Sequence, residues 1–171
     1  MKQLIWTIVF MAMAQLATAQ DIFSAVRNGK TEEVQQYIKS GVDVNAVDAR
    51  GFSPLILAVY NNQPEMAKLL IQLGADVNAK DKSGNNALMG AAFKGYPDMV
   101  RLLVANKADV NQVNYNGAST LIFAATFGNL EIAKILLDNG ADKSIKDANG
   151  KTALDHATLQ ENQNMIELLS I

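Results

Sequence analysis

The sequence predicts an all-α solenoid of helix-turn-helix units joined by β-hairpin-like loops, with three full repeats between two incomplete ones. The main observation is a period of 33 residues: the pattern of residues 48–80 returns in 81–113, in 114–146 and, shortened, in 147–171. Three residue types recur in phase, at Gly51, Gly84, Gly117 and Gly150, at Leu55, Leu88, Leu121 and Leu154, and at Ala58, Ala91, Ala124 and Ala157. A fixed period of this length is typical of stacked units that bury their apolar faces against one another.

Each full unit is predicted to open with a turn and a short first helix. Gly51 provides a backbone position where a positive φ is free of strain. Ser53 precedes Pro54, which suits a helix N-cap followed by proline at the first helical position. The later units place good capping residues at the same point, namely Asn86, Ser119 and Thr152. We therefore expect a first helix to start after each of these caps.

A second helix is predicted to follow the first within each unit. It should begin near Pro64 and Pro97, and acidic residues occupy its first turn, where the helix dipole favours them: Glu65, Asp98 and Glu131. Gly74 and Gly140 are expected to end this helix in the left-handed conformation. Lys107 occupies the matching position of the middle unit, where a side chain costs on the order of 1 kcal/mol.

The two ends of the array are predicted to be capping units. Residues 20–47 lack the leading turn, but Thr31 and the acids after it provide a plausible helix start. The last unit is polar over residues 160–164, where the inner repeats are mixed. Terminal repeats of a solenoid need such a polar outer face. We expect one domain, residues 20–171, with units 20–47, 48–80, 81–113, 114–146 and 147–171.

The first 19 residues do not belong to the repeat and are typical of a secretory signal peptide. Lys2 is followed by an apolar run over residues 4–14 and by Ala17-Thr18-Ala19, a small-residue cleavage site. A membrane anchor is the alternative, but a span needs roughly 20 apolar residues, and Gln15 interrupts this run. We expect a bacterial protein cleaved after Ala19, free of the membrane, and located in the periplasm or outside the cell.

The composition excludes several classes of function. The chain has 15 Lys and Arg against 17 Asp and Glu, a formal net charge of −2, and the signs are interspersed without a basic stripe. A nucleic-acid partner is therefore disfavoured. The chain has no cysteine, which rules out disulfides, thiol chemistry and cysteine-based zinc sites.

No catalytic or metal-binding constellation is visible. His156 is the only histidine, and the residues in phase with it are Leu57, Gly90 and Phe123, which indicates a packing position. A lone histidine also lacks the partners of a catalytic triad or a metal site. The Asp and Asn loops alternate oxygens as calcium loops do, but Lys80 and Val113 interrupt the ligand set. We expect no catalytic residue, no metal and no cofactor.

Three stretches carry a family signature: S-P-L at residues 53–55, L-L-I-x-x-G-A-D-V-N at 69–78 and D-x-x-G at 81–84. With these motifs the chain resembles the ankyrin-repeat family over residues 20–171. One departure is consistent. The family usually has histidine after T-P-L, and this chain has Ile56, Met89, Ile122 and Asp155 there. The resemblance implies that apolar packing replaces the hydrogen bonds which that histidine makes between repeats.

The resemblance also implies a binding surface, the concave face formed by loop tips and first helices. Aromatic and basic residues fall on the matching positions: Arg50, Phe52, Tyr60, Lys80, Lys82, Phe93, Lys94, Tyr115, Phe127 and Lys146. Such residues concentrate binding energy at protein interfaces. The alternative is that each ring packs sideways on the next repeat, although a row of exposed apolar residues usually marks an interface.

The leading hypothesis is a monomeric, non-enzymatic binding protein that docks an acidic or mixed surface of another protein. Family analogy alone suggests a narrower alternative, a secreted effector or an inhibitor or immunity-type protein. An enzyme is the third hypothesis, and turnover that depends on His156 would support it.

Overall fold

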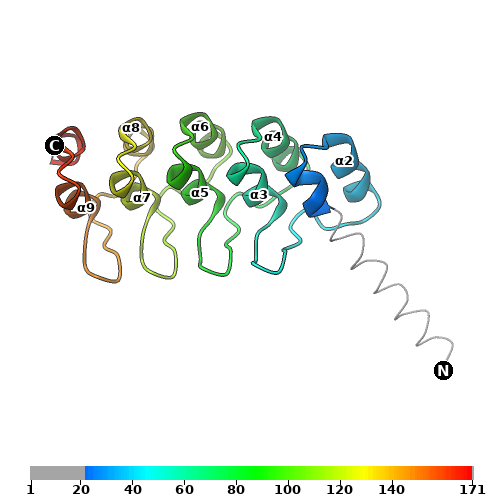
Figure 1. Cartoon of the computed structure of the whole chain (residues 1–171), viewed down its shortest axis with the longest axis horizontal. Coiled ribbons are helices and arrows are strands. Elements are labelled where there is room, and N and C mark those ends of the chain that lie inside the picture. The colour runs from blue at the N-terminus through cyan, green and yellow to red at the C-terminus, as the bar shows by residue number, and fades with distance from the viewer. Residues whose placement is uncertain (1–21, 171) are drawn as a thin grey trace, which may run out of the picture. The chain divides into compact units, whose positions relative to one another are not determined.

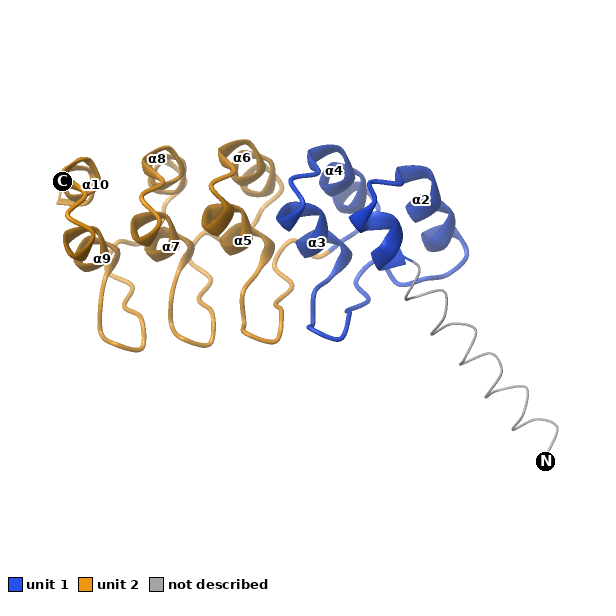
Figure 2. Cartoon of the chain, in the orientation of Figure 1, with its two compact units in different colours: residues 1–75 blue, residues 76–171 orange. Residues whose placement is uncertain are grey.

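The computed structural model describes residues 22–170, so the predicted signal peptide lies outside the described residues. The chain divides into two compact units, residues 1–75 and 76–171 (Figure 2). The named elements are all helices (Figure 1), and within residues 22–170 the only β pairing is an isolated antiparallel bridge between Val113 and Ser119. The all-α prediction is confirmed.

The first unit consists of helix pairs. The chain is helical over residues 22–27, and α2 (Thr31–Lys39), α3 (Pro54–Tyr60) and α4 (Pro64–Gln72) follow. Ser53 caps α3 as predicted, because its hydroxyl accepts a hydrogen bond from the Ile56 N–H at 3.2 Å. Arg27 pairs with Asp48 at 3.0 Å, which links the first helix to the loop before α3.

The second unit holds three helix pairs: α5 (Ala87–Lys94) with α6 (Pro97–Ala105), α7 (Thr120–Thr126) with α8 (Leu130–Asp138), and α9 (Ala153–Leu159) with α10 (Gln163–Ser170). The first helices α5, α7 and α9 pack in one row, and α6, α8 and α10 pack in another (Figure 1). Asn86, Ser119 and Thr152 cap the first helices, as the sequence predicts.

The core of each unit is aliphatic. Ile56, Met89 and Ile122, which stand where the family has histidine, are almost fully buried. Apolar packing replaces the histidine at these three positions, as expected. Asp155 differs because it is exposed and forms a capping box: the Thr152 N–H donates to its carboxylate at 2.8 Å, and the Asp155 N–H donates to the Thr152 hydroxyl at 3.2 Å.

A side-chain bracket fixes the hairpin-like loop in front of α3, α5, α7 and α9. Asp81 Oδ1 accepts hydrogen bonds from the N–H groups of Ser83 and Asn85, at 2.8 and 2.9 Å, while the Asp81 N–H donates to the Asn85 carbonyl. The same arrangement occurs one or more periods away, at Asp48, Asn114 and Asp147. The bracket holds the backbone of the tip and leaves the tip side chains outside it.

Asparagine side chains connect successive repeats within the second unit. Asn111 Nδ2 donates to the Gly140 carbonyl at 3.0 Å, and its Oδ1 accepts from the Asp142 N–H at 2.8 Å. Asn78 makes the matching bonds to Lys107 and Asp109. The preceding aspartates instead bond their own loop, since Asp76 and Asp109 Oδ1 accept from the N–H groups of Asn78 and Asn111 at 2.9 Å.

Candidate functional site

The predicted site residues are distributed over both units, so each unit is described by itself. In the first unit Phe52 and Tyr60 stack with their ring centroids 5.5 Å apart. The guanidinium carbon of Arg50 lies 5.0 Å from the centroid of the Phe52 ring, within cation-π range. Both rings are half-buried. Arg50, Phe52 and Tyr60 therefore form a local cluster, which joins the loop before α3 to the last residue of that helix.

In the second unit the rings of neighbouring repeats touch. Phe93 at the end of α5 and Phe127 just after α7 meet edge to face with centroids 4.9 Å apart, and Phe123 stacks on Phe127 at 6.4 Å. Phe93 and Phe127 nevertheless remain 44% and 49% exposed. The rings thus pack sideways on each other and still present about half of their surface to solvent.

Tyr115 is the most exposed ring of the described chain that was predicted for the site, at 72%. It stands on a hairpin tip, and its N–H donates to the Ser83 carbonyl of the preceding tip at 3.2 Å. The close approach depends on Gly84: a Cβ there would lie 2.7 Å from the Tyr115 nitrogen. The backbone of Tyr115 is therefore fixed while its ring is available.

The predicted cations of the second unit lie on the surface. Lys80 Nζ donates to the Val113 carbonyl at 2.9 Å, which ties it to the next repeat. Lys82, Lys94 and Lys146 are exposed. Within residues 22–170, neither Lys94 nor Lys146 has a carboxylate within ion-pair distance. Both charges are therefore on the surface, and that of Lys146 helps lower the pKa of Asp155.

Between the last two hairpins and the helices α7 and α9 lies a pocket of about 240 Å³, here called the α7–α9 pocket. Its lining combines aromatic, aliphatic and polar side chains: Asn114, Asn116, Ala118, Ile122, Phe123, Thr126, Phe127, Asp147 and His156. Of the predicted site residues, only Phe127 lines it. The sequence did not indicate a pocket, because its walls come from two repeats whose side-chain directions no local rule predicts.

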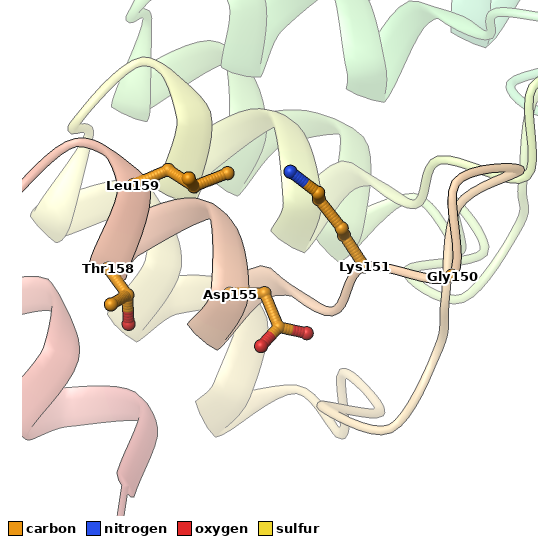
Figure 3. Close-up of a pocket in the computed structure, with 5 residues that line it drawn as sticks. All are labelled: Gly150, Lys151, Asp155, Thr158 and Leu159. Carbon is orange, nitrogen blue, oxygen red and sulfur yellow. The ribbon is translucent and has the colours of Figure 1, made fainter.

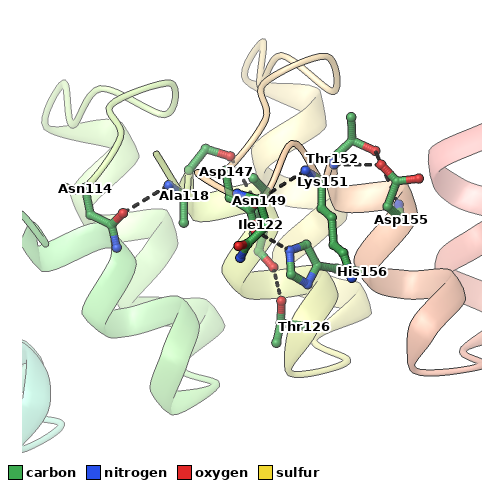
Figure 4. Close-up of polar contacts among 11 residues, drawn as sticks. Asn114, Ala118, Ile122, Thr126, Asp147, Asn149, Lys151, Thr152, Asp155 and His156 are labelled. Atoms are coloured by element: carbon green, nitrogen blue, oxygen red, sulfur yellow. Dashed lines mark hydrogen bonds and ion pairs between the residues drawn. The ribbon is translucent and has the colours of Figure 1, made fainter. Parts of the chain in front are cut away.

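One wall of the pocket contains a part-buried contact between the side chains of His156 and Asp147 (Figure 4). His156 Nε2 lies 2.8 Å from Asp147 Oδ2, and the two side chains are 19% and 9% exposed. Asp147 Oδ1 also accepts from the N–H groups of Asn149 and Lys151. The Lys151 N–H, followed by the His156 ring, lowers the pKa of Asp147 below its usual 3.8. His156 is therefore not a simple packing residue, and sequence reasoning missed its partner nine residues earlier.

Comparison with known families identifies the array. Residues 22–114 match the model described as ankyrin repeats in three copies, and residues 103–157 match the one described as ankyrin repeats in many copies. The chain belongs to the ankyrin-repeat family. The predicted ankyrin solenoid is confirmed as its fold, and ankyrin repeats generally mediate protein–protein interaction without catalysis. No curated protein matches the chain.

A second pocket, of about 420 Å³, lies on the last ankyrin unit (Figure 3). It is lined by Gly150, Lys151, Asp155, Thr158 and Leu159, and Leu159 is 60% exposed. The backbone N–H and the hydroxyl of Thr152 lower the pKa of Asp155, since both donate to its carboxylate. This pocket contains none of the predicted site residues.

The ankyrin repeats of residues 22–170 bring together no group of three or more His, Cys, Asp and Glu side chains that could hold a metal ion. Over the same residues, every helix is too short or too polar to cross a bilayer.

Proposed function

We propose that this ankyrin-repeat protein is an exported bacterial binding protein whose hairpin tips and first helices hold a partner protein. The observation that carries the proposal is the set of exposed rings in the second unit, Phe93, Tyr115 and Phe127. Large aromatic side chains dominate the energy of most protein interfaces. Exposed apolar groups that adjoin one another mark interaction sites more often than scattered ones do.

The arrangement of these rings supports binding in a second way. Phe93 and Phe127 fix each other by their edge-to-face contact, and the hairpin bracket fixes the backbone that carries Tyr115. Side chains that are already ordered lose little conformational freedom on association, so more of their contact energy appears as affinity. The exposed Lys94 adds a positive charge beside the rings, which suits an acidic or mixed partner surface.

Replacing Phe93 and Tyr115 together with alanine tests the proposal. A partner is first isolated by affinity purification from the native periplasm, and its dissociation constant is then measured for each purified variant. The double variant should bind at least about 30-fold more weakly, because truncated hot-spot rings cost 2 kcal/mol or more. Lys134→Ala on α8 is the matched surface control and should bind normally. A folded double variant that binds as well as the unchanged protein would refute the assignment.

Export is a separate part of the proposal and rests on the first 19 residues. The positive Lys2, the apolar run and Ala17-Thr18-Ala19 support a cleavable signal peptide. Protein recovered from the periplasm or the medium should begin at Gln20 by N-terminal mass spectrometry, and Ala19→Arg should cause the precursor to accumulate. Recovery of the chain from the cytosol with its first residues intact would contradict export.

A further inference from the structure

We propose that the α7–α9 pocket receives one large apolar side chain from an acidic segment of the partner protein. The inference rests on the proposed binding function and specifies the chemistry that the partner brings to this place. Three properties of the pocket carry it: its size, its preformed walls and the charges around it.

The size of the pocket fits one side chain and not a small-molecule ligand. Sites for drug-sized ligands or cofactors occupy roughly 300 to 1,000 Å³, and this pocket has about 240 Å³. Ile122, Phe123 and Phe127 make its walls largely apolar. The edges and faces of Phe123 and Phe127 suit an aromatic or a large aliphatic side chain, which gains both burial and ring contact there.

The walls are held by hydrogen bonds that exist before anything binds. Asn114 Oδ1 accepts from the N–H groups of Asn116 and Ala118, and the Ala148 N–H donates to the Asn116 carbonyl at 2.8 Å, which joins the two hairpins. His156 fixes the opposite wall through Asp147 (Figure 4). A pocket of fixed shape binds an inserted side chain with less loss of conformational entropy.

The carboxylates near the pocket already accept hydrogen bonds from internal donors, which favour their charged form. Asp147 receives hydrogen bonds from the backbone of Asn149 and Lys151 and from His156, and little of its side chain is exposed. Asp155 is occupied by its capping box with Thr152. Neither carboxylate is therefore free to form an ion pair with a basic segment of a partner.

Three cations adjoin residues of the pocket, and one of them, Lys146, is close enough to Asp155 for its charge to help lower the pKa of that carboxyl. Lys146 directly precedes Asp147, and Lys94 directly follows Phe93, whose ring contacts Phe127. Lys151 lines the other pocket and donates its backbone N–H to Asp147. Over residues 22–170, none of these three lysines has a carboxylate within ion-pair distance. Carboxylates on both sides of the inserted side chain would meet positive charge, whereas a basic segment would be repelled.

Three synthetic heptapeptides test the proposal directly. The first has a central phenylalanine flanked by glutamates, the second replaces that phenylalanine with alanine, and the third replaces the glutamates with lysines. Each is titrated at low salt into the ¹⁵N-labelled protein. The first should shift the amide resonances of Phe123, Phe127 and His156 and should bind at least about tenfold more tightly than the other two. Salt at 150 mM should reduce the difference from the lysine peptide, which is electrostatic, and not the difference from the alanine peptide.

Matched variants locate the binding. Phe127→Ala and Lys146→Glu should each weaken the first peptide at least about tenfold. Two control variants should leave the binding of this peptide unchanged: Leu159→Ala, at an exposed apolar residue of the other pocket, and Lys134→Glu, which makes the same charge change on α8. All four substitutions are at exposed positions, and far-ultraviolet circular dichroism checks that each variant is folded.

Equal binding of the three peptides, or resonance shifts away from the pocket, would overturn the inference. Its failure is distinguishable from failure of the binding function. If the natural partner is lost on replacing Phe93 and Tyr115 but binds the Phe127→Ala and Lys146→Glu variants normally, the pocket assignment fails and the binding function stands. If neither set of changes affects the partner, both are wrong.

Discussion

At the scale of single residues, backbone conformation explains several choices that side-chain contacts do not. The residue after the C-cap of α4, α6 and α8 has a positive φ: 92° at Gly74, 71° at Lys107 and 82° at Gly140. Glycine adopts this region freely, whereas a residue with a Cβ is strained in it. The prediction that Lys107 occupies the left-handed conformation is thus confirmed, and its strain can be measured.

Lys107→Gly should raise the free energy of unfolding by about 1 kcal/mol, because glycine removes the strain of the left-handed region and suits a helix C-terminus. Gly140→Ala at the same place in the next repeat should lower the free energy of unfolding by a similar amount. A Cβ there meets nothing within 4 Å, so the strain of the positive φ is the only cost. Urea unfolding of both variants checks the pair. An unchanged or lower midpoint for Lys107→Gly would contradict the expectation.

Two glycines with similar φ should respond differently to the same substitution. Gly84 and Gly150 have φ of 80° and 73°, but a Cβ at Gly84 would lie 2.7 Å from the Tyr115 backbone nitrogen, while one at Gly150 meets nothing within 4 Å. Gly150→Ala should therefore cost about 1 kcal/mol, and Gly84→Ala clearly more, because the next hairpin must shift. Thermal unfolding of the two variants measures the difference. Equal losses of stability would show that the hairpin of Tyr115 moves away from the added Cβ at no cost.

At the scale of elements, the first residue of α7 has a buried side-chain hydroxyl without a hydrogen bond to any described residue. Thr120 is fully buried, and its hydroxyl has no hydrogen-bond partner within the described chain. The matching positions of the other repeats hold Pro54, Ala87 and Ala153, which have no polar side-chain atom to satisfy. A buried polar group without a partner costs about 1 to 3 kcal/mol.

Thr120→Val should stabilise the protein by about 1 kcal/mol or more, because valine keeps the shape and removes the unsatisfied hydroxyl. The neighbouring Ser119→Ala should destabilise it by about 1 kcal/mol, because the N-cap hydrogen bond to the Ile122 N–H is lost. Denaturant midpoints of the two variants should move in opposite directions. A destabilised Thr120→Val would indicate that the hydroxyl has a bonded water or another partner.

The hairpin before α9 should make stability depend on acid. The folded pKa of Asp147 lies below its ordinary value of 3.8, so the unfolded chain takes up the proton first as the pH falls. The charged carboxylate of Asp147 therefore adds to the free energy of unfolding above about pH 4, and this contribution is lost as the pH falls further. Asp147→Asn keeps the bracket, as Asn114 does one repeat earlier, and removes this titration.

Urea unfolding at several pH values compares the two proteins. The Asp147→Asn variant should be less stable than the unchanged protein at pH 5 to 7, and the difference should narrow below about pH 4 as the carboxylate of the unchanged protein is protonated. A difference that stays constant down to pH 2 would mean that His156 and the Lys151 backbone do not favour the charged form of Asp147.

The sequence predicted the helix starts because each depends on a few adjacent residues, such as Ser53 before Pro54. It did not predict the partner of His156. Asp147 already had a complete explanation as a turn residue, and the bond between them depends on how the hairpin folds back against α9. Sideways packing of the rings on the next repeat was an expected alternative, but Phe93 and Phe127 occupy different phases of the repeat, so the sequence did not indicate that these two rings meet edge to face.

At the scale of the whole molecule, the fold was predictable because, within a unit, each repeat packs mainly on its neighbours. Within the second unit α7 packs on α5, α8 and α9, and α10 packs on α8 and α9. A rule that holds for one repeat therefore extends along the array. The α7–α9 pocket was not predictable, because it depends on residues that break the repeat, Phe127 and His156 among them.

This pattern of contacts predicts local opening. Met165 on α10 is fully buried, and Met165→Ala should cost about 2 to 5 kcal/mol. Because α10 touches only the last repeats, amide hydrogen exchange should accelerate in α9 and α10 and stay unchanged in α5 and α6. Leu159→Ala, at an exposed position, should change neither the free energy of unfolding nor the exchange rates. Uniform acceleration from α5 to α10 would show that this unit opens as a single cooperative body.

The side-chain bracket of the hairpins has a consequence for how such a protein diversifies. Each bracket consists of one Asp or Asn and the main chain, so the tip residues Arg50, Lys82, Ser83, Tyr115, Asn116 and Asn149 contribute little to it beyond their backbone. Their identities can drift, or be exchanged by grafting, without loss of the scaffold. Recognition of new targets is thereby uncoupled from folding.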